Sequence, residues 1–302
     1  MIILEGPDCA GKSSLAKVVF NDWHYKHQGV YKTDPMVETI IQSDVCMDAT
    51  VWDRLHLGEQ VYGPVYRGDD KLGMACLRMT ERYLLRKRSV VIRCLPPWEN
   101  VRAEFEQRLN EEMFGRGDDW QLKLRGQYSG YERLKTHLRM WDWDYTTDDP
   151  VKLRDQVLAG LPEHDSGPGV GDFTRGGILI IGEQPNIART HAFAKMDLPF
   201  IDRQGCSRWL AEHMDEAGLP ERGLYWINAL QRNGKTTDEA FLDQLEPKHV
   251  FALGQKARLW AQIAGLQPHY YQHPSAWMRF HGAEEYPFIT HLQEVTRGSD
   301  PQ

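Results

Sequence analysis

The stretch GPDCAGKSS, residues 6–14, decides the fold of the first half of the chain. It matches the pattern GxxxxGK[ST] and lies between an apolar run, MIILEG at residues 1–6, and a segment with helical spacing, KSSLAKVVF at residues 12–20. A phosphate-binding loop needs this context, because backbone N–H groups and the N-terminus of the following helix must together face the phosphate oxygens. The sequence therefore predicts a nucleotide-binding α/β domain.

Each fixed position of that pattern has an expected task. The glycines Gly6 and Gly11 let the backbone wrap around phosphate groups, and Lys12 is expected to reach the β- and γ-phosphates of ATP. The hydroxyl of Ser13 is expected to bind Mg2+, and Ser14 completes the cofactor-binding set. The predicted cofactors are therefore ATP and Mg2+.

Length and composition favour a globular chain of two domains. The 302 residues are 41% hydrophobic and 26% charged, and they are enough for two cores of ordinary size. No stretch approaches the roughly 20 apolar residues of a membrane helix, and Glu5 and Asp8 interrupt the N-terminal apolar run. We expect no membrane partner and a cytoplasmic location. The five cysteines lack CxxC spacing, so neither disulfides nor a zinc or iron–sulfur site is expected.

The charge of the chain does not suggest extensive contact with nucleic-acid phosphates. The formal net charge is -7, whereas phosphate contacts require Lys and Arg side chains. The densest basic segment is RMTERYLLRKR at residues 78–88. It is interpreted either as a local binding patch or as the solvated face of a helix.

Strand and helix signals alternate in both halves, as in parallel sheets. In the first half, strands are expected at residues 49–54, 89–97 and 140–146, and a helix at 98–114. Residues 163–176 have no periodicity and read as a linker. The pattern then restarts, with strands expected at residues 178–185, 224–230 and 249–254 and helices at 205–219 and 255–266. The predicted domains are residues 1–162 and 177–302.

The segment WDRLHLGEQVYGPVYRG, residues 52–68, is the best indication of the phosphate acceptor. A strand that ends in Asp53 and Arg54 places a carboxylate and a guanidinium at the edge of the sheet where ligands of open α/β sheets bind. Asp53 could accept the proton of an attacking hydroxyl, and Arg54 could hold phosphate oxygens. An ion pair at the strand end is the alternative.

Residues 1 to about 162 resemble the thymidylate kinase and deoxynucleoside kinase family in three segments: IILEGPDxAGKSS, HLGExVYGPVYRG and IRCLPPWENV. The resemblance implies a P-loop kinase domain with a parallel sheet. It also implies that Asp8 approaches the sugar of the acceptor nucleotide, that Arg116 of FGRGDD covers the transferring phosphoryl group, and that Tyr128 of LRGQYSGYERL lines the acceptor site. Cys9 stands where the family commonly has glycine.

Residues 177–280 resemble the uracil-DNA glycosylase superfamily in LIIGEQPN, YWINAL and HPSAWMR. The resemblance implies that Phe200 stacks on an extruded base, that Asn228 binds its Watson–Crick edge, and that His273 lies against its carbonyl or a phosphate. Glu183 is shared with some branches, but the residues after it differ from those of strong glycosylases. The cysteines of the iron–sulfur branches are also missing. Base binding is therefore expected rather than base cleavage.

The two halves together resemble what a phage kinase for 5-hydroxymethyluracil in DNA requires. This implies a phosphotransferase that acts on the hydroxymethyl group, in the cytoplasm of an infected host. Its partner would be double-stranded DNA containing a modified pyrimidine, and no protein partner is evident. Two alternatives stay open: a deoxynucleoside monophosphate kinase with a glycosylase-like DNA-binding domain, and a DNA glycosylase with a regulatory P-loop domain.

Overall fold

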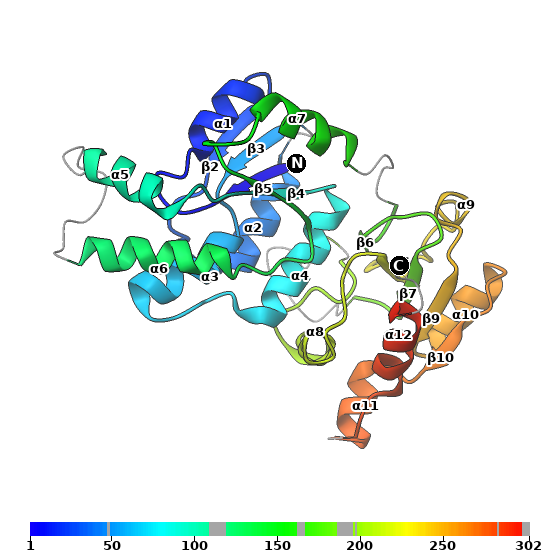
Figure 1. The fold of residues 1–302 in the computed structure, drawn as a ribbon. Helices are drawn as coiled ribbons and strands as arrows, with labels where there is room; N and C mark the ends of the chain where they lie inside the picture. The colour runs from blue at the N-terminus through cyan, green and yellow to red at the C-terminus, as the bar shows by residue number, and fades with distance from the viewer. Residues whose placement is uncertain are drawn as a thin grey trace. The chain divides into compact units, whose positions relative to one another are not determined.

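The structure is a computed structural model that describes residues 1–46, 49–108, 119–161, 167–185, 196, 198–282 and 284–297. Its elements are drawn in Figure 1. Contacts divide the chain into two compact units, Met1–Gly73 with Lys87–Leu161 and Met74–Arg86 with Pro162–Gln302. Each unit is mixed α/β and is built around its own five-stranded sheet.

The sheet of the first unit is entirely parallel and has the strand order β2-β3-β1-β4-β5. Its strands are β1 (Ile2–Glu5), β2 (His24–His27), β3 (Thr50–Asp53), β4 (Val90–Cys94) and β5 (Arg139–Trp143). The central strand β1 is buried along its whole length, as expected of a parallel strand covered on both faces. Because β1 and β3 are neighbours, the segments that follow them meet at one edge of the sheet.

Helices cover both faces of this sheet (Figure 1). They are α1 (Lys12–Val19), α2 (Pro35–Asp44), α3 (Leu57–Arg67), α5 (Trp98–Arg108), α6 (Trp120–Glu132) and α7 (Pro150–Ala159). Leu15 of α1 and Val157 of α7 belong to one apolar core with Ile2 and Ile92 of the sheet. Both α2 and α7 begin with an Asp-Pro pair whose carboxylate accepts backbone N–H bonds, which is a strong helix-start signal.

The sheet of the second unit has the strand order β10-β9-β7-β8-β6, and only β6 is antiparallel to its neighbour among the described strands. Its strands are β6 (Val170–Gly171), β7 (Ile178–Gly182), β8 (Leu224–Asn228), β9 (His249–Leu253) and β10 (His269–Tyr271). Its helices are α4 (Gly73–Arg86, from Met74 on), α8 (Gly205–Glu216), α9 (Leu242–Leu245), α10 (Gln255–Ile263), α11 (Pro274–Phe280) and α12 (Pro287–Arg297). Within the described ranges, no helix combines the length and hydrophobicity that a membrane crossing requires.

The segment expected to be a linker is partly built into the second sheet. Its described part, residues 167–176, contains β6, whose Val170 is fully buried and pairs with Trp226 of β8. A Cβ atom at Gly169 or Gly171 would collide with backbone carbonyl oxygens of β8. These glycines therefore permit a close approach of two backbones. The high glycine content of the segment, which suggested a flexible linker, is required here by packing against β8.

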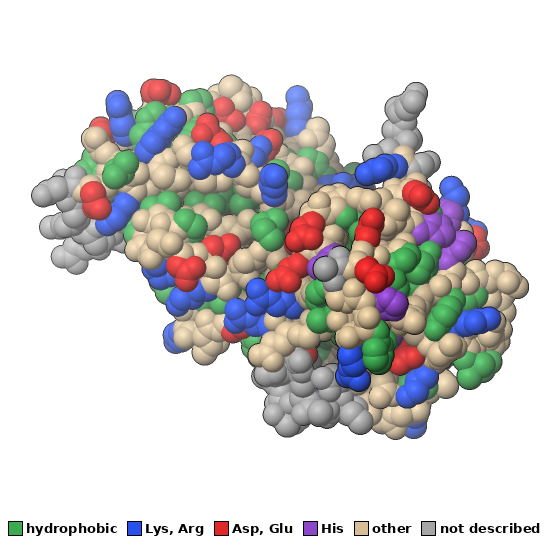
Figure 2. Space-filling view, turned by 90° about the horizontal axis from the view of Figure 1, so that it is seen from below, with side chains coloured by type: hydrophobic (Ala, Val, Ile, Leu, Met, Phe, Trp, Pro, Cys, Tyr) green, Lys and Arg blue, Asp and Glu red, His purple; other side chains and the backbone are tan. Residues whose placement is uncertain are grey.

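The first two arginines of the basic segment at residues 78–88 form neither a binding patch nor a solvated face. Arg78 and Arg82 lie on α4 and are 1% and 0% exposed. Their charges are compensated inside the second unit by Asp215 and Glu221. On the face drawn in Figure 2, the exposed Lys and Arg side chains are mixed with Asp and Glu.

Candidate active site

The phosphate loop connects β1 to α1, and its two glycines are required by close neighbours. Gly11 is the N-cap of α1 and has φ 80, a left-handed conformation that favours glycine. A Cβ atom there would also press on Trp143 and Tyr145, at 3.2 and 3.1 Å. At Gly6, a Cβ atom would collide with the carbonyl oxygen of Cys94. The loop is therefore held against the ends of β4 and β5.

The ammonium group of Lys12 lies inside this loop. Its Nζ donates hydrogen bonds to the carbonyl oxygens of Gly6 (2.9 Å) and Pro7 (2.7 Å), and the residue is only 5% exposed. Burial lowers the pKa of Lys12, and the positive charge of Arg54 lowers it further to a smaller extent. A buried cation is costly unless anions are near, so the loop would gain from a bound phosphate group.

Ser13 and Asp53 form one polar group beside the loop. The Ser13 hydroxyl donates to Oδ2 of Asp53 (2.7 Å), and the Tyr25 hydroxyl donates to the same oxygen (2.6 Å). Burial alone would raise the pKa of Asp53, but Lys12 and these hydrogen bonds lower it overall. The other oxygen, Oδ1, is buried and has no hydrogen-bond partner in the described part of the chain.

A hydroxyl and an ionised carboxylate at the end of a phosphate loop are the ligands that Mg2+ prefers. The unpartnered Oδ1 of Asp53 fits the same purpose, because an isolated buried oxygen is otherwise unfavourable. The residues present therefore fit the predicted metal. This geometry also suits a metal-ligand role for Asp53, beside the predicted role as acceptor of the substrate proton.

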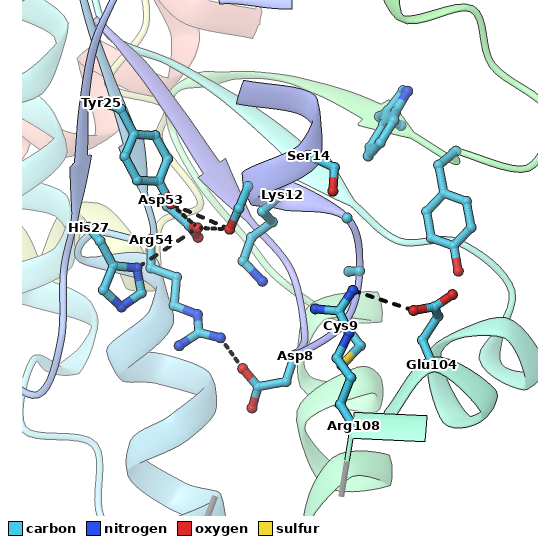
Figure 3. A pocket seen from close by; sticks show the side chains of 15 residues that line it. Asp8, Cys9, Lys12, Ser14, Tyr25, His27, Asp53, Arg54, Glu104 and Arg108 are labelled. Carbon is cyan, nitrogen blue, oxygen red and sulfur yellow. Dashed lines mark hydrogen bonds and ion pairs between the residues drawn. The ribbon is translucent and has the colours of Figure 1, made fainter. Parts of the chain in front are cut away.

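Asp8 and Arg54 form a second polar group on the other side of Lys12 (Figure 3). The Asp8 carboxylate accepts hydrogen bonds from Arg54, from the Tyr62 hydroxyl (3.1 Å) and from Nε2 of Gln127 (3.1 Å). The Arg54 guanidinium also lies over the Tyr62 ring, 4.7 Å from its centroid. Arg54 thus pairs with the carboxylate of the phosphate loop, and both groups are oriented by several contacts.

These groups line a single cavity of about 620 Å³, a volume typical of small-molecule sites. Lys12, Ser13, Asp53 and the Asp8–Arg54 pair all contribute to its wall. The sequence did not point to several other lining residues, which are Tyr25 and His27 of β2, Arg108 of α5, and the aromatic residues Trp143 and Tyr145. Aromatic side chains beside a phosphate loop offer flat surfaces for a nucleobase.

Tyr25 and His27 of β2, which sequence analysis did not single out, have only a weak strand signal in the sequence. The strand reads HYKH and is mostly exposed, so it lacks the apolar alternation that indicates a strand. Tyr25 and His27 nevertheless stand two residues apart and so share one face. In the sheet, His27 pairs in register with Asp53, which brings this face of β2 next to the polar group of Ser13 and Asp53.

Tyr128 does not line the 620 Å³ cavity, unlike the prediction. Its hydroxyl donates to the carbonyl oxygen of Pro96 (2.9 Å), and its ring packs edge-on against Trp98 between α5 and α6. Tyrosines of α3 lie beside Asp8 instead, because Tyr62 donates to Asp8 and Gln127 bonds both Asp8 and the Tyr66 hydroxyl (2.6 Å). Arg116 lies outside the described residues.

In the second unit, Phe200, Asn228 and His273 gather around Gly182, and we refer to these four residues as the Phe200 cluster. A Cβ atom on Gly182 would lie 2.6 Å from the Phe200 ring and 2.9 Å from Oδ1 of Asn228. The Phe200 and His273 rings are stacked with centroids 6.0 Å apart. Nδ2 of Asn228 is buried without a hydrogen-bond partner in the described ranges. A buried unpaired amide is costly, so this nitrogen is available to donate a hydrogen bond to a ligand.

Glu183 follows Gly182 directly and has a structural partner. Its Oε1 accepts a hydrogen bond from the backbone N–H of Lys256 (3.2 Å), at the beginning of α10. A Cβ atom on Gly254 would clash with the Glu183 side chain. The carboxylate therefore lies at a helix N-terminus, where negative charge is stabilised.

A pH dependence is expected from His273. Burial lowers its pKa below the ordinary 6.5, against a smaller opposing effect of Glu183, and its Nδ1 accepts the N–H of Ser275 as the N-cap of α11. Below pH 6.5 the unfolded chain therefore binds more protons at this ring than the folded chain, and the second unit loses stability as the pH falls.

His273→Asn keeps an N-cap acceptor but does not titrate. Its unfolding free energy should therefore fall less between about pH 7 and about pH 5 than that of the wild type, as measured by urea unfolding. An identical fall in both proteins would show that this histidine does not contribute. Other histidines are unchanged in the variant, so their effects cancel in the comparison.

No protein-family model matches the chain, and no curated protein matches its sequence. Among solved structures, the YorR protein of Bacillus subtilis in complex with phosphorylated GDP is similar over 52% of this chain and 93% of its own, with 19% identity and a TM-score of 0.42. Deoxyadenosine kinase of M. mycoides with bound dCTP is similar over 53% of this chain and 99% of its own, with 14% identity and a TM-score of 0.32. The same kinase with bound dATP is similar over 52% of this chain and 96% of its own, with 14% identity and a TM-score of 0.31. These likenesses are weak, and the functional assignment rests on the geometry of the site.

Proposed function

We propose that the protein is an ATP- and Mg2+-dependent phosphotransferase that phosphorylates the hydroxymethyl group of 5-hydroxymethyluracil in double-stranded DNA. One observation carries the kinase part: the loop ammonium of Lys12, the Ser13–Asp53 group and the Asp8–Arg54 pair line one cavity. Phosphoryl transfer depends mainly on positioning and on neutralising charge, and this set of residues supplies both.

The chain's residues divide into a donor side and an acceptor side. Lys12 would hold the β- and γ-phosphates, while Ser13 and Asp53 would hold Mg2+, whose positive charge neutralises the phosphates as they are transferred. On the acceptor side, the Asp8 carboxylate is fixed by Arg54, Tyr62 and Gln127. Asp8 would accept a hydrogen bond from the attacking hydroxyl, and Arg54 would bind the transferring phosphoryl group.

Asp53→Asn is expected to lower kcat by about 100-fold or more, because an amide removes the negative charge that would hold Mg2+ beside Ser13. Nucleotide affinity measured without the metal should change little. A metal-ligand role also requires that the variant need more Mg2+ for half-maximal rate. An unchanged Mg2+ requirement together with an altered pH profile of kcat would assign Asp53 to proton transfer instead.

The Phe200 cluster supports a base within DNA as the acceptor. An extruded pyrimidine needs a flat apolar surface and an amide that pairs with its edge, and the cluster offers the Phe200 ring and the unpartnered Nδ2 of Asn228. Extrusion costs a few kcal/mol, which stacking and pairing would offset. Because the exposed charges seen in Figure 2 are of both signs, we attribute the specificity to this cluster rather than to general attraction of phosphates.

A second candidate function is phosphorylation of a free deoxynucleoside monophosphate. It is favoured by the acceptor side of the first unit, where Gln127 donates hydrogen bonds to both Asp8 and the Tyr66 hydroxyl and so links them in one polar group. Such a group could bind a free nucleotide without the second unit.

The test uses γ-labelled ATP and Mg2+ with duplex DNA containing 5-hydroxymethyluracil, unmodified duplex of the same sequence, and free deoxynucleoside monophosphates. The proposal requires label in the modified duplex and none in the unmodified one. Label that enters only dTMP or hydroxymethyl-dUMP would establish the second candidate function. Cleavage of the glycosidic bond without label transfer would overturn both.

Asn228→Ala is expected to lower kcat/KM for the modified duplex by about tenfold or more, since a buried amide that reads a base edge contributes a strong share of discrimination. The matched control is Asn233→Ala, because Asn233 is an exposed asparagine of the same unit. Equal rates for the wild type and Asn228→Ala would remove the base-reading role of this residue.

A further inference from the structure

The two buried arginines of α4 reach into the surroundings of the Phe200 cluster. Arg82 and Glu221 are both 0% exposed, and Arg78 is 1% exposed. The Glu221 carboxylate accepts hydrogen bonds from Arg78 (3.0 Å), from Nε and Nη2 of Arg82 (3.0 and 2.6 Å) and from the Trp226 indole (3.1 Å). This carboxylate therefore fixes the plane of the Arg82 guanidinium.

The guanidinium of Arg82 also contacts Phe200 directly and through an aromatic neighbour. Its Nη1 donates to the backbone carbonyl oxygen of Phe200 (3.0 Å). Its central carbon lies over the Trp226 ring, 3.9 Å from the centroid, and that ring meets the Phe200 ring in a T-shaped contact at 5.5 Å. Both the backbone and the ring of Phe200 are thus linked to one buried group.

Phe200 needs such support because its backbone is in an unfavourable conformation. Its φ is 52, in the left-handed region that bulky residues rarely adopt. Residues keep such a conformation only where the surrounding contacts impose it. The same conformation directs the ring against Gly182, at the contact that defines the cluster.

We propose that Arg82 is a positioning residue that holds Phe200 in this left-handed conformation and thereby sets the stacking surface for the base. The part that concerns the base rests on the function proposed above. The part that concerns Phe200 is independent of any ligand. A helix that interrupts the first unit in the sequence would then determine the geometry of a binding site in the second.

Arg78 provides a matched control on the same helix. It shares Glu221 with Arg82, and its other hydrogen bonds go to Asp215 (2.6 Å) and the carbonyl oxygen of Leu219 (2.5 Å). In the described part of the chain, none of its hydrogen bonds goes to Phe200. Arg78→Lys and Arg82→Lys both keep the charge and lose the planar fork. They differ in the contacts that only Arg82 makes, which include the hydrogen bond to Phe200 and the stacking on Trp226.

The first experiment labels the full-length protein with 4-fluorophenylalanine and records 19F NMR spectra without ligand, with Phe200→Leu used to assign the Phe200 resonance. We expect Arg82→Lys to shift or broaden that resonance and Arg78→Lys to leave it in place, with the unfolding midpoints of both variants measured alongside. An unmoved resonance in Arg82→Lys, or equal shifts in both variants, would overturn the proposal. Should Arg82→Lys not fold, the double variant Arg82→Met/Glu221→Gln replaces it, since it removes one charge of each sign.

The second experiment compares affinity for a duplex containing 5-hydroxymethyluracil with affinity for the unmodified duplex. The preference for the modified duplex should fall about tenfold in Arg82→Lys and stay within about twofold in Arg78→Lys, since only the former loses the hydrogen bond that holds Phe200. Suppose that the wild type binds both duplexes equally while the 19F resonance of Phe200 still shifts in Arg82→Lys. That pair of results supports the positioning role of Arg82 and overturns the proposed base binding. A preference that is unaffected by Arg82→Lys overturns the role of Arg82 in recognition.

Discussion

Lys12→Ala is expected to abolish phosphoryl transfer, with kcat lowered by about 1,000-fold or more, because the loop loses the charge that neutralises the transferring phosphate. The Lys12 ammonium lies inside the loop, 2.9 Å from the carbonyl oxygen of Gly6 and 2.7 Å from that of Pro7. No other side chain of α1 can therefore take its place. Label transfer from γ-labelled ATP, measured at saturating nucleotide, checks the prediction.

The matched control for this variant is Lys17→Ala. Lys17 lies on the same helix but is exposed, so its loss should leave the rate within about twofold of the wild type, as for most surface substitutions. Because burial lowers the pKa of Lys12, its removal also relieves a desolvation penalty, and the variant should unfold at the same or a higher denaturant concentration. Transfer by a folded Lys12→Ala protein at the wild-type rate would place the phosphates elsewhere.

The alternation of apolar runs and helical segments predicted much of both sheets. The strands expected at residues 49–54, 89–97, 178–185, 224–230 and 249–254 correspond to β3, β4, β7, β8 and β9, because buried parallel strands are nearly continuous apolar runs. The strand expected at residues 140–146 corresponds to β5, at one edge of the first sheet, whereas the other three edge strands were missed. β2 and β10 are rich in His and Tyr and are partly exposed, and β6 is only two residues long.

The phosphate loop could be predicted because its chemistry is local, whereas the roles of charged residues depend on neighbours that are distant in the sequence. The metal-ligand role proposed for Asp53 rests on the hydrogen bonds that Ser13 and Tyr25 both donate to its carboxylate, a contact between three separate segments. The family resemblance placed Tyr128 at the acceptor site, but its hydroxyl donates a hydrogen bond to the carbonyl oxygen of Pro96. The burial of Arg78 and Arg82 depends on their ion pairs with Glu221, about 140 residues further along the chain. The hydrophobic periodicity of a helix cannot predict a contact with a residue so distant in the sequence.

Glu221→Ala is expected to lower the unfolding free energy of the second unit by about 3–5 kcal/mol, the usual effect of leaving buried charges without their partner. Glu221 accepts four hydrogen bonds, from two arginines and from the indole of Trp226. Without it, Arg82 keeps the carbonyl oxygen of Phe200, and Arg78 keeps Asp215. Urea unfolding followed by tryptophan fluorescence measures the loss, with Glu216→Ala as an exposed control on α8.

The cause of this loss can be separated from simple loss of packing. If uncompensated charge is responsible, the triple variant Arg78→Met, Arg82→Met, Glu221→Leu should recover most of the stability, because joint apolar replacement of buried ion-pair partners is often neutral or stabilising. Asp215, which remains, has a side chain that is 16% exposed and therefore reaches solvent. Recovery of stability should not restore selectivity for a modified base, since the triple variant also lacks the hydrogen bond from Arg82 to Phe200. A triple variant no more stable than Glu221→Ala would mean that shape, rather than charge, makes Glu221 necessary.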